Sequence, residues 1–180
     1  VLFTVKGVTY TRYSDSDGCA QLEINLYPGE YEITTSHNTY SCTNNISVLS
    51  PYGKIGDLVK YCRNETQFRV LILGPTGTHA GANENVQFTI NGVTYNNVTD
   101  FRGYAMLTIN LQPGVYNITT RYNGYNCYNT VTVLSRIITS DMTMQYHDGS
   151  YFSAVILDGH GNPFPNQNVT FKINNVNYVY

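Results

Sequence analysis

Thiols are the side chains in this chain best able to form covalent cross-links, and it contains four cysteines, Cys19, Cys42, Cys62 and Cys127. Four cysteines allow three disulfide pairings. If strands alternate up and down, Cys19 and Cys42 fall at the same end of a domain, so a disulfide between them is geometrically possible. Cys62 and Cys127 would lie at opposite ends. We expect those two to bond across a domain junction or between chains, and free thiols remain the alternative.

A second set of chemistry-bearing residues consists of asparagines in Asn-x-Ser/Thr triplets, which match the acceptor motif for N-linked glycosylation. Asn117 lies between two residues predicted to face a core, so its own side chain should face solvent. Asn64 is expected in a hairpin turn and Asn97 near an edge or loop. We predict glycans at several of the triplets, although all could be ordinary polar strand and turn residues: Asn45, Asn64, Asn97, Asn117 and Asn168.

Other reactive side chains do not form a recognisable site. The segment Asp15–Gly18 resembles the start of a calcium loop but lacks the remaining ligands, so a turn is the better interpretation. Ser, His and Asp occur without a nucleophile elbow. We therefore predict no catalytic residue, metal or cofactor, and no enzyme activity. The histidines do not have the spacing of metal ligands: His37, His79, His147 and His160. Four lysines could form side-chain isopeptide bonds with Asn or Asp, but the sequence selects no partner for them: Lys6, Lys54, Lys60 and Lys172.

The elements that must position these residues are indicated by the composition. The net charge is −2 with 12% charged residues, which excludes the clustered basic surface of a nucleic-acid-binding protein. No basic amphipathic segment or long apolar run predicts membrane contact. The chain has 17 tyrosines and no tryptophan, and it mixes strand formers with Asn and Gly. Such a mixture is typical of all-β proteins, and 42% hydrophobic residues are enough to build a core.

Internal repetition is the strongest signal in the sequence. The segment Val1–Tyr10 recurs as Val86–Tyr95 and again as Val169–Tyr178, at offsets of 85 and 83 residues. A second block, Gly18–Thr35, recurs as Gly103–Thr120. A period of this length suits one small β-sandwich per repeat.

The repeat register predicts three ranges: residues 1–49 as the C-terminal part of one repeat, residues 50–134 as a complete repeat, and residues 135–180 as the N-terminal part of the next. Within the complete repeat, alternation predicts about seven short strands joined by turns, as in an immunoglobulin-like sandwich. Asn91-Gly92 predicts a tight two-residue hairpin, and Lys6-Gly7 and Asn174-Asn175 occupy the same position. Short linkers between the ranges favour a semi-rigid rod.

These blocks resemble the immunoglobulin-like repeats of adhesin-like cell-surface proteins, found mainly in methanogenic archaea and related to bacterial immunoglobulin-like domains. The resemblance covers essentially the whole chain and implies an extracellular stalk or adhesive filament without catalytic residues. The four cysteines depart from the usual pattern of such repeats. The matching stretches are Asp57–Asn64, Phe68–Leu73, Asp158–Pro163, Val86–Tyr95, Ala20–Thr35 and Asn44–Leu49.

Three functions remain open at this point. The first is a structural and adhesive role at the cell surface, with neighbouring repeats, identical chains, or surface glycans and proteins as partners. The second is a passive spacer in a wall-acting enzyme whose catalytic module lies outside this fragment. The third is a fibre formed by strand complementation between chains, because the chain starts and stops inside strand patterns.

Overall fold

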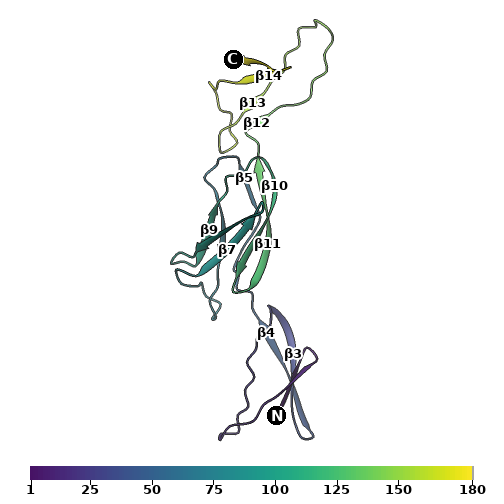
Figure 1. Cartoon of the computed structure of the whole chain (residues 1–180), viewed down its shortest axis with the longest axis vertical. Coiled ribbons are helices and arrows are strands. Elements are labelled where there is room, and N and C mark those ends of the chain that lie inside the picture. Colours follow the sequence, from purple (N-terminus) through teal and green to yellow (C-terminus); the bar gives the residue numbers. More distant parts are fainter. Residues whose placement is uncertain (180) are drawn as a thin grey trace.

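The computed structural model describes residues 1–179 and is all-β, which confirms the predicted fold class. Figure 1 shows three parts arranged end to end along the long axis, with the N-terminus at one end and the C-terminal strands at the other. Among the described residues, every strand pair joins two strands from the same predicted range. Residues 50–134, in the middle, contain most of the buried core.

The larger sheet of the middle part has the strand order β5-β11-β10-β7-β8. Its only parallel pair is β5 with β11, and the other neighbours are antiparallel. The alternation of apolar and polar residues along β7 puts Val86, Phe88 and Ile90 on the buried face. The strands are β5 (Leu58–Tyr61), β7 (Asn85–Ile90), β8 (Val93–Val98), β10 (Gly114–Tyr122) and β11 (Tyr125–Leu134).

A smaller sheet, β6 (Gln67–Leu71) with β9 (Tyr104–Thr108), faces the larger one, and a bridge between Tyr52 and Ile72 extends it. The core lies between the two sheets. Phe68 and Phe88 meet there edge to face, with their ring centroids 6.0 Å apart. Such face-to-face packing of two sheets is the architecture of a β-sandwich.

A tyrosine near the start of β10 shows a further feature of immunoglobulin-like sandwiches. The hydroxyl of Tyr116 donates to the carbonyl oxygen of Gln112, 2.8 Å away and four residues upstream. Tyr31 makes the equivalent bond to Tyr27 at 2.7 Å. This arrangement corresponds to the tyrosine corner that holds the turn before this strand in such folds.

The predicted two-residue hairpins are confirmed. Asn91 and Gly92 have φ values of 50° and 75° and connect β7 to β8. Lys6-Gly7 and Asn174-Asn175 also have positive φ values and connect the corresponding strands of the outer parts. Positive φ at both central residues gives the backbone twist that matches the flanking strands.

The expected hairpin around Asn64 is wrong. Instead of pairing with β6, strand β5 pairs in parallel with the distant β11, and the segment between β5 and β6 crosses from the larger sheet to the smaller one. Lys60 holds this crossing in place, because its buried ammonium group donates to the carbonyl oxygens of Asn64 and Thr66, and to that of Ile109 beyond β9. Burial lowers the pKa of Lys60.

Residues 1–49 form one sheet of order β2-β1-β3-β4, which matches β8-β7-β10-β11 of the middle part. Residues 20–28 form no strand, although they repeat the sequence around β9. The reason is that β9 pairs with β6, and residues 1–49 contain no counterpart of β6. The strands are β1 (Leu2–Val5), β2 (Val8–Thr11), β3 (Gly29–His37) and β4 (Tyr40–Val48).

The last part contains two separate strand pairs, β12 with β13 and β14 with β15. Residues 139–154 are irregular. They include the positions that match β5 and most of β6, and residues 135–179 contain no counterpart of β11 or β9 for these to join. The inner side of β14 therefore borders an open apolar hollow of about 880 Å³, lined in part by Phe152, Ile173 and Tyr178. The strands are β12 (Ile137–Ile138), β13 (Val155–Ile156), β14 (Thr170–Ile173) and β15 (Val176–Val179).

Candidate functional site: the inter-repeat junctions and the sequons

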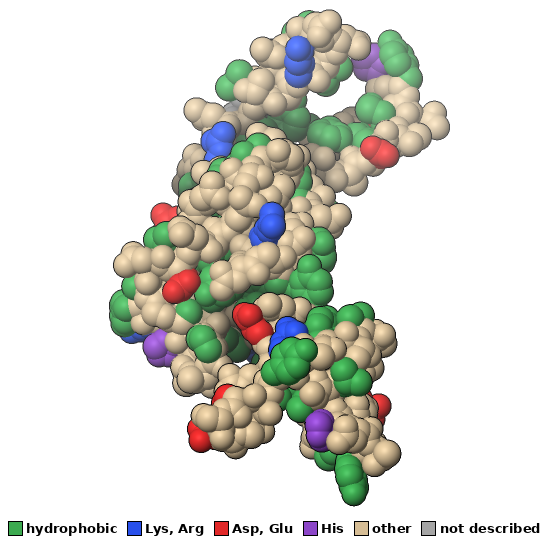
Figure 2. Space-filling view, turned by 60° about the horizontal axis from the view of Figure 1, so that its bottom comes forward, with side chains coloured by type: hydrophobic (Ala, Val, Ile, Leu, Met, Phe, Trp, Pro, Cys, Tyr) green, Lys and Arg blue, Asp and Glu red, His purple; other side chains and the backbone are tan. Residues whose placement is uncertain are grey.

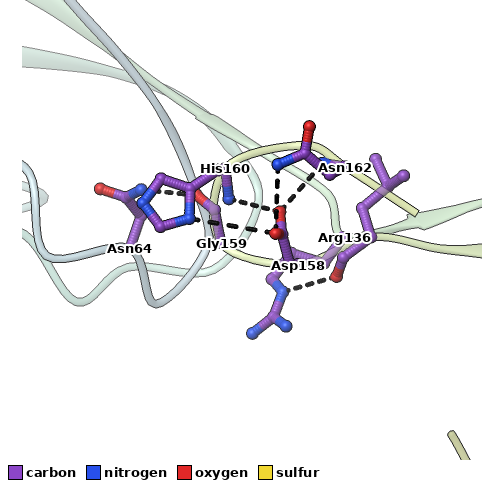
Figure 3. Close-up of polar contacts among 7 residues, drawn as sticks. Asn64, Arg136, Asp158, Gly159, His160 and Asn162 are labelled. Carbon is purple, nitrogen blue, oxygen red and sulfur yellow. Dashed lines mark hydrogen bonds and ion pairs between the residues drawn. The ribbon is translucent and has the colours of Figure 1, made fainter. Parts of the chain in front are cut away.

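The turn Asp158–Asn162 lies where the last part meets the middle one (Figure 3). One carboxylate oxygen of Asp158 accepts the backbone N–H groups of Asn162 at 2.9 Å and His160 at 2.7 Å. These hydrogen bonds lower the pKa of Asp158, with that from Asn162 contributing most. A carboxylate held in this way fixes the shape of the turn and hence the direction of the Gly159 carbonyl.

Asn64 contacts this turn across the junction (Figure 3). Its side-chain nitrogen donates to the carbonyl oxygen of Gly159, and its side-chain oxygen accepts the N–H of Thr66 at 2.6 Å. Gly161 packs so closely on Tyr61 that a Cβ added there would lie 2.5 Å from the ring. The amide of Asn64 therefore joins two repeats, which the sequence pattern did not reveal.

The linker before β12 is tied to the same turn. The side-chain Nε of Arg136 donates to the carbonyl oxygen of Leu157 at 2.9 Å, and the N–H of Leu157 donates to the carbonyl of Arg136 at 2.8 Å. Two hydrogen bonds between one pair of residues restrict the linker where it leaves the middle part. The linker and the turn are thus held as one unit.

Three tyrosines lie in a row at the other junction, between residues 1–49 and the middle part. The ring of Tyr125, in the middle part, lies 6.0 Å from the ring of Tyr27 and 6.0 Å from the ring of Tyr52. The Tyr52 hydroxyl lies 2.7 Å from the carbonyl oxygen of Tyr125 and 3.0 Å from that of Thr120. Burial raises the pKa of Tyr52 well above its usual value. This row of rings continues the buried end of the middle part towards the preceding repeat.

The Asn-x-Ser/Thr acceptor triplets, or sequons, fall into two structural groups. Asn45, Asn117 and Asn168 are exposed. Asn97 is half-buried, and its side-chain nitrogen donates to the carbonyl oxygen of Met106 at 2.5 Å. Asn64 is half-buried at the junction. Two of the predicted sequons therefore use their amide groups for structural contacts.

The cysteines are free thiols throughout the described chain. Cys62 donates its backbone N–H to Leu134 at the end of β11, and Cys127 lies seven residues earlier on that strand. At about 3.4 Å per residue the two are roughly 24 Å apart. A disulfide requires Cα atoms within about 7 Å, so Cys62 and Cys127 cannot bond within one repeat.

The repeat register also argues against the Cys19–Cys42 pairing. Cys19 matches Tyr104, whose ring lies 4.5 Å from the Arg69 guanidinium on the outer face of the smaller sheet. Cys42 matches Cys127, which lies opposite the buried Thr120 and so faces the core. In a complete sandwich the two side chains would point in different directions.

The remaining candidate residues have local roles. Asp15 accepts the backbone N–H groups of Asp17 at 3.0 Å and Cys19 at 2.9 Å, so its carboxylate forms a turn. Asp100 does the same in the next repeat. No group of three or more His, Cys, Asp or Glu residues that could hold a metal ion occurs within residues 1–179. The hydrogen bonds of the Lys60 ammonium group go to backbone carbonyls, and no side-chain amide or carboxylate of the described residues accepts one.

The exposed surface carries few charges. On the face shown in Figure 2, lysine, arginine and acidic side chains are few among the uncharged polar and hydrophobic ones. Large aromatic side chains are prominent, and Tyr13, Tyr40 and Tyr128 are 92%, 79% and 72% exposed. Across the described residues, no helix is long and apolar enough to span a membrane.

No protein-family model matches the chain, and no curated protein does either. Among solved structures, domains 4–9 of the surface layer protein SbsC align with a TM-score of 0.32 and 11% identity over 95% of this chain, which spans 37% of that structure. SbsC domains 4 and 5 align with a TM-score of 0.33 and 16% identity, and the alignment covers 74% of this chain and 70% of that structure. The Bacteroides ovatus mixed-linkage glucan utilization locus protein SGBP-B aligns with a TM-score of 0.31 and 15% identity. This alignment covers 83% of this chain and 43% of that structure. These TM-scores are too low to place the chain in a family.

Proposed function

We propose that this chain is a structural and adhesive section of an extracellular surface protein, in which sandwich repeats form a stalk or filament and perform no catalysis. The observation that carries this proposal is the contact between Asn64 and the turn at Gly159. A chain of freely jointed domains does not need such a contact, whereas a rod does, because each junction must resist bending. The resemblance to adhesin-like repeats supports the same role.

The surface chemistry fits an adhesive role. Exposed tyrosines combine an apolar ring with a polar hydroxyl, which suits contacts with glycans and proteins. Tyr40 and Tyr128 are two such residues, on β4 and β11 of successive repeats. The partners we propose are neighbouring repeats and surface glycans or proteins.

The rod can be tested by loosening one junction. Ala at position 161 would place its Cβ against the Tyr61 ring, so Gly161→Ala should open the contact with the preceding repeat. Gly77 occupies the same turn position in the middle repeat and has a similar φ of 76°, against 86° for Gly161. A Cβ at Gly77 would meet nothing within 4 Å, so Gly77→Ala is the matched control for backbone strain.

Small-angle X-ray scattering and negative-stain electron microscopy provide the readout. The parent chain and Gly77→Ala should appear as straight particles of uniform length, and Gly161→Ala should appear bent over a range of angles. If the parent chain already bends freely, the rod proposal fails. A catalytic module found elsewhere in the same polypeptide would replace the stalk role with that of a spacer in a surface enzyme.

A further inference from the structure

Two of the sequons lie at the same cross-strand residue pair in successive repeats, one on each strand of the pair. On the larger sheet of the middle part, Asn117 of β10 lies directly opposite Thr130 of β11. In the preceding repeat, Asn45 of β4 lies directly opposite Glu32 of β3. The offset of 85 residues matches Asn117 with Glu32 and Asn45 with Thr130. An acceptor asparagine is therefore present at the same cross-strand pair in both repeats, on opposite strands.

The position lies on the outer face of the sheet. Ile118, next to Asn117, is fully buried, and the alternation of a strand then directs Asn117 to solvent. Ile33, next to Glu32, is buried as well, which places the Glu32–Asn45 pair on the same outer face. Both asparagines are exposed.

The surroundings leave room for a saccharide. Short hydroxyl side chains line the outer face next to Asn45, where Thr34 and Thr43 hydrogen-bond across β3 and β4 at 3.1 Å. Beside Asn117, Tyr128 lies on the same face, opposite Thr119, with 72% of its side chain exposed. A flat polar surface with an aromatic ring at its side can accommodate a sugar without displacing any core residue.

Asn97 and Asn64 differ from Asn45 and Asn117, because their side-chain amides donate hydrogen bonds to backbone carbonyls. The Asn97 amide donates to Met106 on the neighbouring β9, and the hydroxyl of Thr99, the last residue of that sequon, is buried and donates to the carbonyl oxygen of Gly81 at 2.7 Å. The Asn64 amide donates to Gly159 of the next repeat. A saccharide on either nitrogen would have to displace a contact that joins two strands or two repeats.

We propose that Asn45 and Asn117 carry N-linked glycans at this repeated outer-face position, whereas Asn64 and Asn97 remain unmodified. The proposal rests on the extracellular role argued above. In the reaction, the side-chain nitrogen forms a bond to the anomeric carbon of a saccharide carried on a polyprenyl phosphate or diphosphate. The bond from that carbon to the phosphate oxygen breaks, the phosphate leaves with its electron pair, and the amide loses one proton.

The test is secretion of the whole chain from a eukaryotic host with N-glycosylation, followed by intact-mass and glycopeptide analysis. Most copies should carry saccharide on the peptides that contain Asn45 and Asn117, and those that contain Asn64 and Asn97 should have their unmodified masses. Asn117→Gln and Asn45→Gln should each remove one glycan mass. Thr119→Ala should remove the same glycan as Asn117→Gln, because it destroys the acceptor triplet while keeping the asparagine.

A stability measurement separates accessible from structural sequons. Asn97→Gln should lower the melting temperature of the unglycosylated chain, because the bond to Met106 is lost, and Asn117→Gln should leave it unchanged. Asn45 and Asn117 unmodified in a folded, secreted chain would overturn the proposal, as would glycans on Asn97 in most copies. Either result would leave the rod itself, which scattering tests independently, unaffected.

Discussion

The ammonium group of Lys60 donates a hydrogen bond to the carbonyl oxygen of Ile109 at 3.0 Å, and this bond links the two sheets of the middle repeat. Lys60 comes from β5 in the larger sheet, and Ile109 follows β9 in the smaller one. The same ammonium group also holds the crossing segment through the carbonyls of Asn64 and Thr66. One buried cation therefore bonds three backbone acceptors, of which the carbonyl oxygen of Ile109 is buried away from water.

Lys60→Met should destabilise the middle repeat by about 2 to 3 kcal/mol, because three hydrogen bonds from a charged donor are lost and the carbonyl oxygen of Ile109 stays buried. Lys54→Met is the matched control, since Lys54 is exposed and should tolerate the same change. Urea denaturation monitored by tyrosine fluorescence measures the difference. Equal midpoints for the two variants would show that Lys60 does not hold the crossing.

Tyr52→Phe should lower the free energy of unfolding by about 1 to 2 kcal/mol near neutral pH, because it removes the hydroxyl that bonds the carbonyl oxygens of Thr120 and Tyr125. The pKa of Tyr52 is raised in the folded state, so the folded chain keeps its proton where the unfolded chain ionises. Its contribution to stability is therefore complete below the ordinary pKa of 10.0 and is lost as the pH rises above it.

The variant should lose stability less steeply than the parent between pH values of about 9 and about 11. Some alkaline loss should remain, because the pKa of Tyr122 is also raised by burial. Denaturant titrations at both pH values provide the measurement. Parallel stability curves for parent and variant would contradict the role of Tyr52.

Gly103→Ala should lower the stability of the fold far more than Gly18→Ala, although the two glycines occupy the same repeat position with a φ of 77°. A left-handed alanine costs about 1 to 2 kcal/mol at either site. At Gly103 the new Cβ would also lie 2.8 Å from the carbonyl oxygen of Ala80, whereas at Gly18 it would meet nothing within 4 Å. We expect at least about 2 kcal/mol of additional loss from this overlap. Thermal unfolding of the two variants measures it, and similar melting temperatures would refute it.

Alkylation should rank the cysteines by exposure. Cys19 and Cys42 are exposed and should react first with iodoacetamide, while Cys127 should react slowly, because burial raises the pKa of its thiol and lowers the thiolate fraction. Peptide mass spectrometry after timed quenching gives the order. After unfolding without a reductant, all four thiols should be labelled. Fewer labels would reveal a disulfide.

Local features of the fold could be predicted well. The Asn91-Gly92 hairpin and its two repeats follow from residue types that tolerate positive φ, and this preference acts within a few residues. The inward positions of Phe88 and Ile90 follow from alternation along one strand. The exposure of Asn117 follows from the same alternation.

Predictions that required a choice of strand partner were less successful. The polar segment after β5 indicates a turn, and a hairpin is the simplest interpretation, yet β5 joins β11 instead. Residues 20–28 have the alternation of a strand but form none, since no counterpart of β6 lies beside them. A strand needs a neighbour for its backbone hydrogen bonds, and alternation does not identify that neighbour.

The repeat, the all-β class, the hairpin turns and the alternating faces can all be predicted from the sequence, because they depend on residue type over short distances. The parallel pairing of β5, the burial of Lys60 and the partner of Asn64 depend on how distant segments pack together. Asn64 and Gly159 are separated by 95 residues, and their contact exists because two folded repeats place a side-chain amide opposite a carbonyl. Acceptor triplets of the same Asn-x-Thr pattern are thus exposed at Asn117 and structural at Asn64, because the packing around each differs.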